Sequence, residues 1–149
     1  MKTVKEILTD KGKEVCSVSP KTTVFDALKI MGEQGIGSVV VIGDDGKVKG
    51  IMTERDYARK VILIGKASPE TPVEEIMTPS KKLYTVRPET TAEECMVLIT
   101  GKRIRHLPVF DGGKLVGVVS IGDVVKSIIS EQSVLLEHLS DFIAGKYGA

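Results

Sequence analysis

The stretch Gly50-Ile-Met-Thr-Glu-Arg-Asp56 returns later in the chain as Gly117-Val-Val-Ser-Ile-Gly-Asp123. An earlier pair of stretches also matches, because Val18-Ser-Pro-Lys-Thr-Thr23 is similar to Val86-Arg-Pro-Glu-Thr-Thr91. Internal repetition of this kind indicates that one supersecondary unit is built twice. Only two copies fit into 149 residues, which excludes a long solenoid. We therefore expect two half-domains related by a pseudo-twofold axis, with equivalent clefts between them.

The composition indicates a globular chain and argues against several classes of partner. Hydrophobic residues make up 42% of the chain and charged residues 28%, enough for a core and a soluble surface. A formal net charge of +1 and 4% aromatic residues give no basis for binding nucleic acid or an anionic membrane. No apolar run approaches the roughly 20 residues of a membrane span, and the first residues do not resemble a signal peptide. The two cysteines lack metal-site spacing, so we expect a reduced, cytoplasmic protein that requires no metal.

Each repeat is predicted to fold as strand, helix, strand, strand, helix, which gives an α+β fold class. Ser38–Ile42 is a continuous β-branched run, typical of a strand buried on both faces. Gly43-Asp-Asp-Gly46 then indicates a hairpin turn. The elements expected in the first copy are Glu14–Val18, Val24–Gln34, Ser38–Ile42, Lys47–Met52 and Glu54–Ile64. Those expected in the second copy are Lys82–Val86, Ala92–Gly101, His106–Phe110, Lys114–Val119 and Gly122–Ser130.

The repeats also define the expected domain limits. Residues 1–65 form the first repeat with its N-terminal lead-in, 66–81 the linker and second lead-in, 82–130 the second repeat, and 131–149 a C-terminal helix. Within the last segment, Ser133–Tyr147 carries an apolar stripe at helical spacing. This stripe either packs on its own domain or forms a contact with a second copy of the chain.

Thr53 and Ser120 occupy the same place in the two copies, where a buried strand is expected to turn into a helix. A hydroxyl group at this position leaves free amides in the first helical turn, which favour an anion such as phosphate. Asp56 and Asp123 follow three residues later and can accept hydrogen bonds from both hydroxyls of a ribose. The alternative is a capping box, which closes the helix end without any ligand. Recurrence at the same repeat position favours a nucleotide ligand.

A basic cluster precedes one strand of the second copy: Lys102, Arg103, Arg105 and His106. Such a run is usually solvated, but here core residues follow it directly, so part of it is expected to face inward. Arginine binds phosphate through two parallel hydrogen bonds, and histidine can donate one more. The matching stretch of the first copy, Gly35-Ile-Gly-Ser38, carries no charge. We therefore expect two unequal clefts, of which one attracts anions more strongly.

The sequence does not predict catalysis. We find no serine–histidine–aspartate set, no glycine-rich phosphate loop and no paired acids with a nearby histidine. The two aspartates at 43–46 resemble a metal-binding loop only superficially, because a hairpin turn explains them. Cys16 and Cys95 have no evident activating base.

The repeats resemble tandem cystathionine-β-synthase-type domains, the CBS pair or Bateman module, from about Val4 to Ile129. The resemblance rests on motifs of both copies: Val18-Ser-Pro with Val24 and Ala27-Leu28, the strand 39–42, Gly50–Asp56, Arg105-His-Leu-Pro-Val109 and Gly117–Asp123. It implies a regulatory or sensor module that binds an adenine nucleotide between the repeats. AMP is the ligand expected first, with ADP, ATP, NAD or S-adenosylmethionine as further members of the class. It also implies a homodimer and a target protein that remains unknown.

The resemblance further implies which residues contact the ligand. One set joins Thr53, Arg55 and Asp56 with residues of the second repeat: Tyr84, Ile104, Arg105 and His106. The other set joins Ser120, Gly122 and Asp123 with residues of the first repeat: Cys16, Ile36, Gly37 and Ser38. The alternative function is that of an interaction scaffold, in which the clefts are vestigial and bind no ligand.

Overall fold

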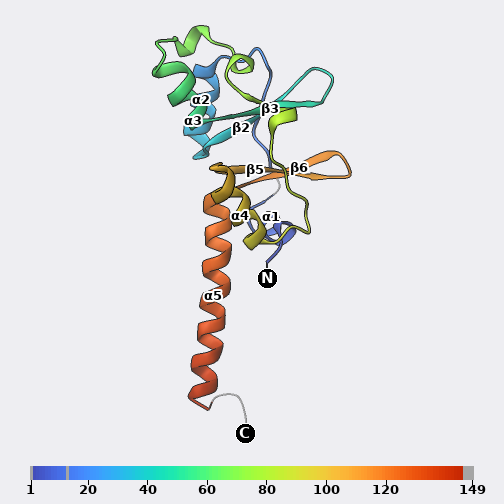
Figure 1. Cartoon of the computed structure of the whole chain (residues 1–149), viewed down its shortest axis with the longest axis vertical. Helices are drawn as coiled ribbons and strands as arrows, with labels where there is room; N and C mark the ends of the chain where they lie inside the picture. The colour runs from blue at the N-terminus through green and yellow to red at the C-terminus, as the bar shows by residue number, and fades with distance from the viewer. Residues whose placement is uncertain (1, 13, 146–149) are drawn as a thin grey trace. The chain divides into compact units, whose positions relative to one another are not determined.

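The computed structural model describes residues 2–12 and 14–145, and these fall into two compact units. The middle unit consists of Glu14–Leu83. The terminal unit combines the N-terminal segment up to residue 12 with the chain from Tyr84 onward. Figure 1 gives the order of the elements along the chain. The described helices include none that is both long and apolar enough to cross a membrane.

The middle unit is built on a four-stranded sheet in the order β1-β2-β3-β4. Strand β1 pairs in parallel with β2, and the other neighbours are antiparallel. The bounds of the strands are β1 Ser17–Val18, β2 Ser38–Ile42, β3 Val48–Thr53 and β4 Thr78–Pro79. The helices are α2 Val24–Gln34 and α3 Glu54–Tyr57, with a π-helical turn at Ala58–Ile62 and 3-10 turns at Ser68–Glu70, Val73–Glu75 and Ser80–Lys82.

Local signals explain the limits of α2. The Thr23 hydroxyl accepts a hydrogen bond from the Asp26 amide at 3.2 Å and caps the first turn. Gly35 ends the helix at φ 65°, a left-handed conformation that glycine adopts without strain. The apolar side of α2 then joins the core of the unit, formed by Val18, Val24, Ala27, Met31, Val39, Val41, Met52, Val61, Val73 and Ile76.

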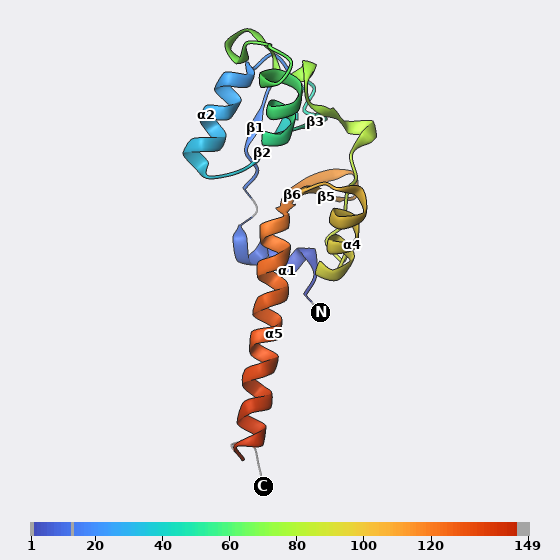
Figure 2. The same ribbon diagram turned by 60° about the vertical axis from the view of Figure 1, so that its left-hand side comes forward.

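The described part of the terminal unit contains an antiparallel hairpin and three helices. The hairpin pairs β5 (His106–Asp111) with β6 (Lys114–Ser120), and the helices are α1 (Val4–Lys11), α4 (Ala92–Lys102) and α5 (Ile121–Ile143). The first turns of α5 lie near α1, while the rest of α5 extends away from the other elements of the terminal unit (Figures 1 and 2). The buried core consists of Val4, Ile7, Leu8, Val86, Ala92, Cys95, Ile99, Leu107, Val109, Val119 and Val124.

Two predicted strands are wrong or too long. The strand predicted over Glu14–Val18 is reduced to Ser17–Val18. The strand predicted over Lys82–Val86 is absent, because the chain forms a 3-10 turn at Ser80–Lys82 and only Val86 pairs, in a single bridge with Val109.

Two predictions on helices also need correction. The helix predicted over Glu54–Ile64 is α-helical only to Tyr57 and then widens into the π-helical turn. The helices predicted over Gly122–Ser130 and Ser133–Tyr147 form one continuous α5, because neither glycine nor proline interrupts the chain between them. The end of the second prediction, Tyr147, lies outside the described residues.

The segment that precedes the strands of each repeat belongs to the compact unit that contains the strands of the other repeat. Helix α1 belongs to the terminal unit, where the Val4 amide donates to the Thr90 carbonyl at 2.8 Å. The second lead-in belongs to the middle unit, where the Val73 amide donates to the Thr22 carbonyl at 2.8 Å. The domain limits predicted at 1–65, 66–81, 82–130 and 131–149 divide the chain into consecutive segments and stay a prediction. The compact units differ from such segments, because the terminal unit combines residues from both ends of the chain.

Candidate functional site

Asp56 closes the start of α3 in the middle unit. The Thr53 amide donates to Asp56 Oδ2 at 3.0 Å, and the Asp56 amide donates back to Thr53 Oγ1 at 3.2 Å. Strand β3 delivers Thr53 to this position, and Asp56 is only 9% exposed. The two reciprocal bonds form a complete capping box.

Asp123 repeats this arrangement at the start of α5 in the terminal unit. The Ser120 amide donates to Asp123 Oδ2 at 2.9 Å, and the Asp123 amide donates to Ser120 Oγ at 3.2 Å. The capping box considered as an alternative is therefore formed in both copies. A ligand role for these carboxylates would have to come in addition to the cap.

A lysine holds each of the two carboxylates, and the sequence reasoning missed both. Lys60 Nζ lies 3.1 Å from Asp56 Oδ1, and Lys11 Nζ lies 2.6 Å from Asp123 Oδ2. Lys60 could have been found from the sequence, because residues four apart face each other on a helix. Lys11 could not, because it comes from α1 and meets Asp123 only in the folded unit. Lys60 therefore balances the charge of Asp56 at the oxygen that the cap leaves open. Lys11, in contrast, meets Asp123 at the same Oδ2 that accepts the Ser120 amide.

Each capping box follows the second strand of a hairpin and lies beside the loop that enters the first strand of that hairpin. In the middle unit the Glu54 amide donates to the Gly37 carbonyl at 3.1 Å, and Ser38 pairs with Thr53. Ile36 packs on the core, and the Cys16 carbonyl accepts from the Val40 amide at 3.0 Å. The structure thus brings Gly37 and Ser38 to the capping box of their own unit.

The terminal unit shows the same arrangement with charged residues. The Ile121 amide donates to the Arg105 carbonyl at 2.8 Å, and His106 pairs with Ser120. Ile104 packs against the core of this unit, and Gly122 is exposed on the first turn of α5. The structure thus brings Arg105 and His106 close to Ser120 and Asp123. The two predicted ligand sets combine residues of both units and stay a prediction.

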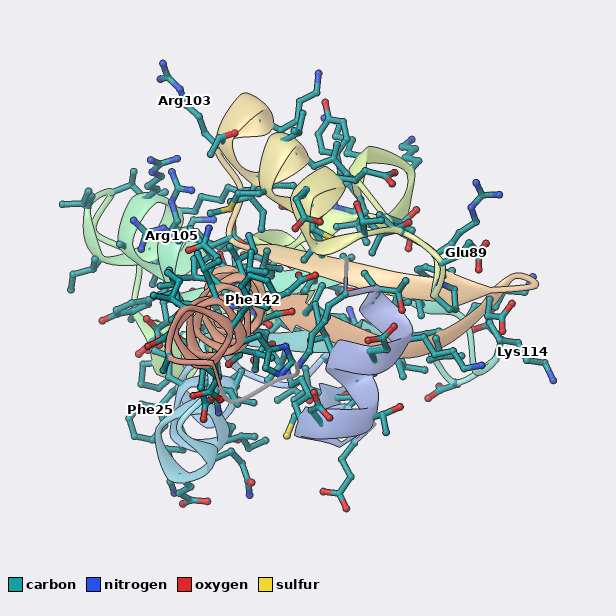
Figure 3. All side chains as sticks on the ribbon, turned by 90° about the horizontal axis from the view of Figure 1, so that it is seen from below. Phe25, Glu89, Arg103, Arg105, Lys114 and Phe142 are labelled. Carbon is teal, nitrogen blue, oxygen red and sulfur yellow. The ribbon has the colours of Figure 1, made fainter. Side chains whose placement is uncertain are left out.

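Most of the basic cluster faces solvent. Lys102, Arg103 and Arg105 are exposed, and Figure 3 shows Arg103 reaching away from the ribbon. Lys102 Nζ lies 5.2 Å from the centre of the Tyr84 ring, a cation–π contact at a ring that is 44% exposed. Arg55, in the middle unit, is half-buried. Of the cluster, His106 is the member that turns inward.

His106 carries a buried polar atom that no partner satisfies. Its Nδ1 is inaccessible to solvent and makes no hydrogen bond among the described residues. Burial lowers the pKa of His106 first, and the positive charges of Lys11 and Arg105 lower it further, against the opposing effect of Asp123. The ring is therefore neutral at pH 7 and offers either an acceptor or a donor to a bound group.

The lowered pKa of His106 predicts that the protein loses stability as the pH falls. The unfolded chain binds a proton at His106 below about pH 6.5, whereas the folded chain resists protonation. The free energy of unfolding should therefore decrease as the pH falls below about 6.5. In H106Q this part of the slope should disappear, as measured by urea unfolding at several pH values. An unchanged slope in H106Q would contradict the assignment.

Other ionisable groups offer little chemistry. Burial, together with the nearby charges of Glu94 and Glu93, raises the pKa of the Cys95 thiol to about 11, so the thiol is not nucleophilic at pH 7. Burial also acts to raise the pKa of Asp123, but Lys11 and the Ser120 amide outweigh it and hold the pKa below its usual value. Residues 2–12 and 14–145 contain no group of three or more histidine, cysteine or acidic side chains that could hold a metal ion.

Comparisons with known proteins cover both repeats. A family model described as CBS domain matches residues 4–63 and 68–130. The CBS domain-containing protein CBSX3, mitochondrial, of Arabidopsis thaliana is 40% identical over 153 residues, which is 97% of this chain and 73% of the relative. A solved structure with CBS domains from Burkholderia ambifaria is 50% identical with a TM-score of 0.82, covering 88% of this chain and 96% of that one. The hexameric CBS-CP12 protein from bloom-forming cyanobacteria is 31% identical with a TM-score of 0.73, and the match covers 84% of this chain and 70% of that one.

Proposed function

The chain belongs to the CBS-domain family, and from that premise we propose that it is a non-catalytic regulatory module that binds an adenine nucleotide. One observation carries the proposal. Two carboxylates, Asp56 and Asp123, occupy the same place in both repeats, in the first turn of a helix that follows a buried strand. Repetition of a cap alone does not require a lysine on each carboxylate, yet both have one.

The nucleotide would use these groups in a defined way. The vicinal hydroxyls of its ribose would donate to an aspartate and take the place of the lysine ammonium there. The released lysine would then pair with phosphate, together with Arg105 and Arg55. In the set of Asp56 the adenine would lie against Ile104 with Tyr84 at its edge, and in the set of Asp123 it would lie against Ile36 with Cys16 at its edge. Because Gly37 and Ser38 are uncharged where Arg105 and His106 are basic, the two sites should differ in affinity.

Regulation follows if the nucleotide binds one arrangement of the repeats better than another. A ligand shifts a conformational equilibrium only by its differential affinity for the two states. The target that reads this shift would be another protein. We keep the cytoplasm as the proposed location, although the Arabidopsis relative is named as mitochondrial.

A thermal-shift screen tests the proposed function. AMP, ADP, ATP, NAD and S-adenosylmethionine are added separately to the full chain, with inosine monophosphate as a control for base recognition. A ligand present at 100 times its dissociation constant stabilises a protein by about 2.7 kcal/mol. For a chain of this size that raises the melting temperature by roughly 5 °C or more. If no adenine compound raises it, the scaffold module with vestigial clefts is the better reading.

We also propose that a second copy of this chain covers the free part of α5. Six apolar side chains between Val134 and Ile143 are more than half exposed on this helix. Among them Leu135, Leu139 and Phe142 follow the alternating spacing of four and three residues that lets identical helices pack together. A symmetric pair of α5 helices would bury the same stripe on both chains.

Light scattering after gel filtration tests this pairing. The wild type should show twice the 16.1 kDa of one chain. L139E, which places a charge in the middle of the stripe, should shift the protein to the mass of one chain, whereas E137Q should leave the dimer intact. A monomeric wild type, or a dimer that survives L139E, would contradict the proposed contact.

A further inference from the structure

A small cavity lies between α1 and α5 in the terminal unit. Its volume is about 120 Å³. That is far below the ~300 Å³ at which sites for drug-sized ligands begin, but it accommodates several water-sized groups. Most of its lining side chains are polar or charged, and those used below are Lys2, Asp10, Lys11, Asp123, Lys126 and Ser127. The cavity therefore suits a small polar group rather than an apolar ligand or a nucleoside.

The charges around the cavity leave one cation in excess. Lys2 Nζ lies 3.1 Å from Asp10 Oδ2, and Lys11 Nζ lies 2.6 Å from Asp123 Oδ2. Lys126 has no acidic partner in the part of the chain that the structure describes. Three ammonium groups around two carboxylates would repel a metal ion and attract an anion.

Ser127 supplies an independent sign that a ligand belongs in the cavity. The residue is only 6% exposed, and its hydroxyl makes no hydrogen bond among the described residues. A buried hydroxyl without a partner lowers the stability of a folded chain, so such groups are rare and call for an explanation. An anion in the cavity would accept the hydrogen bond that the Ser127 hydroxyl now lacks.

We propose that this cavity binds a phosphate group, held by the Lys126 ammonium and the Ser127 hydroxyl. Its tetrahedral oxygens can accept from several lysines and the hydroxyl at once. The site does not depend on the proposed nucleotide function, because Lys126 and Ser127 belong to neither of the two predicted ligand sets. The two would nevertheless communicate, because Lys11 lines the cavity and also holds Asp123. An anion that attracts Lys11 would leave the Asp123 carboxylate free to accept a ribose.

The test is a titration of the full chain with inorganic phosphate at constant ionic strength, followed by amide NMR signals of α1 and α5. We expect saturable shifts at Lys126 and Ser127. K126Q should weaken phosphate binding about tenfold, the effect of losing one charge-assisted hydrogen bond. The matched control is K114Q, because Lys114 lies on the β5–β6 hairpin (Figure 3) and does not line the cavity, and this variant should bind like the wild type. S127A should bind phosphate more weakly and yet be more stable than the wild type without phosphate.

Two results would overturn the proposal. One is the absence of saturable shifts with phosphate, and the other is an equal loss of affinity in K126Q and K114Q. Adding AMP or adenosine to the phosphate-loaded chain shows whether the site binds free phosphate or the phosphate of a nucleotide. Displacement by AMP but not by adenosine would assign the site to the phosphate of a nucleotide, and simultaneous binding would assign it to free phosphate. A chain that binds phosphate but no adenine compound would retain the site and reject only the proposed nucleotide function.

Discussion

Replacement of Asp56 by alanine should weaken AMP binding by about 2 kcal/mol, roughly thirtyfold in the dissociation constant. The carboxylate is the acceptor proposed for the ribose hydroxyls, and hydrogen bonds to a charged group are the strong ones in such a site. Isothermal titration of AMP into the wild type and D56A measures the difference. The variant also loses its capping box, which lowers its stability by about 1 kcal/mol. The titration should therefore be carried out well below the melting temperature of the variant.

A matched control keeps this result specific. Asp45 is an exposed aspartate of the β2–β3 turn whose Oδ2 lies 3.0 Å from Lys49 Nζ, so it also has a lysine partner. D45A removes the same group from the same unit and should leave the affinity for AMP unchanged. Equal affinities of D56A and the wild type would remove Asp56 from the site, and an equal loss in both variants would indicate an effect of net charge alone.

Replacement of Gly50 by alanine should destabilise the middle unit by about 3 kcal/mol, at the upper end of the cost of overpacking. A Cβ at this position would lie 2.3 Å from the Thr78 carbonyl oxygen, which belongs to the backbone of β4 and cannot rotate away. Strands β3 and β4 pair here, with Gly50 opposite Pro79. The variant must therefore separate the two strands, which urea unfolding will detect as a lower midpoint.

The control for Gly50 is a glycine with free space around it. Gly32 lies inside α2, and an added Cβ would meet no atom within 4 Å. G32A should stabilise the protein by about 0.5–1 kcal/mol, because alanine is the better helix former. A G50A variant as stable as the wild type would show that β4 does not pack on β3 in this way.

Local signals allowed parts of the fold to be predicted to the residue. The limits of α2 follow from a threonine that can cap its first turn, Thr22 or Thr23 by the sequence and Thr23 in the structure, and from Gly35 at its end. Strand β2 coincides with the β-branched run Ser38–Ile42. The break predicted near Ser133 failed because serine alone does not end a helix, and the strand predicted over Lys82–Val86 failed because only Val86 finds a partner.

The candidate site was predictable only where it depends on residues close in the chain. The capping boxes at Thr53 and Ser120 follow from their three-residue spacing. Lys11 on Asp123, and the buried Nδ1 of His106, depend on which elements pack together, and no short-range pattern encodes that. The same is true of the cavity beside Ser127, which needs α1 and α5 in place.

The central claim is that an aspartate of each repeat accepts the hydroxyls of a ribose. The most direct measurement compares AMP with 2′,3′-dideoxy-AMP by isothermal titration against the full wild-type chain. The base and the phosphate are the same in both compounds, so only the hydroxyls differ. The account predicts that the dideoxy compound binds at least tenfold more weakly, the loss of one or more hydrogen bonds to a carboxylate. Equal affinities for the two compounds would contradict it.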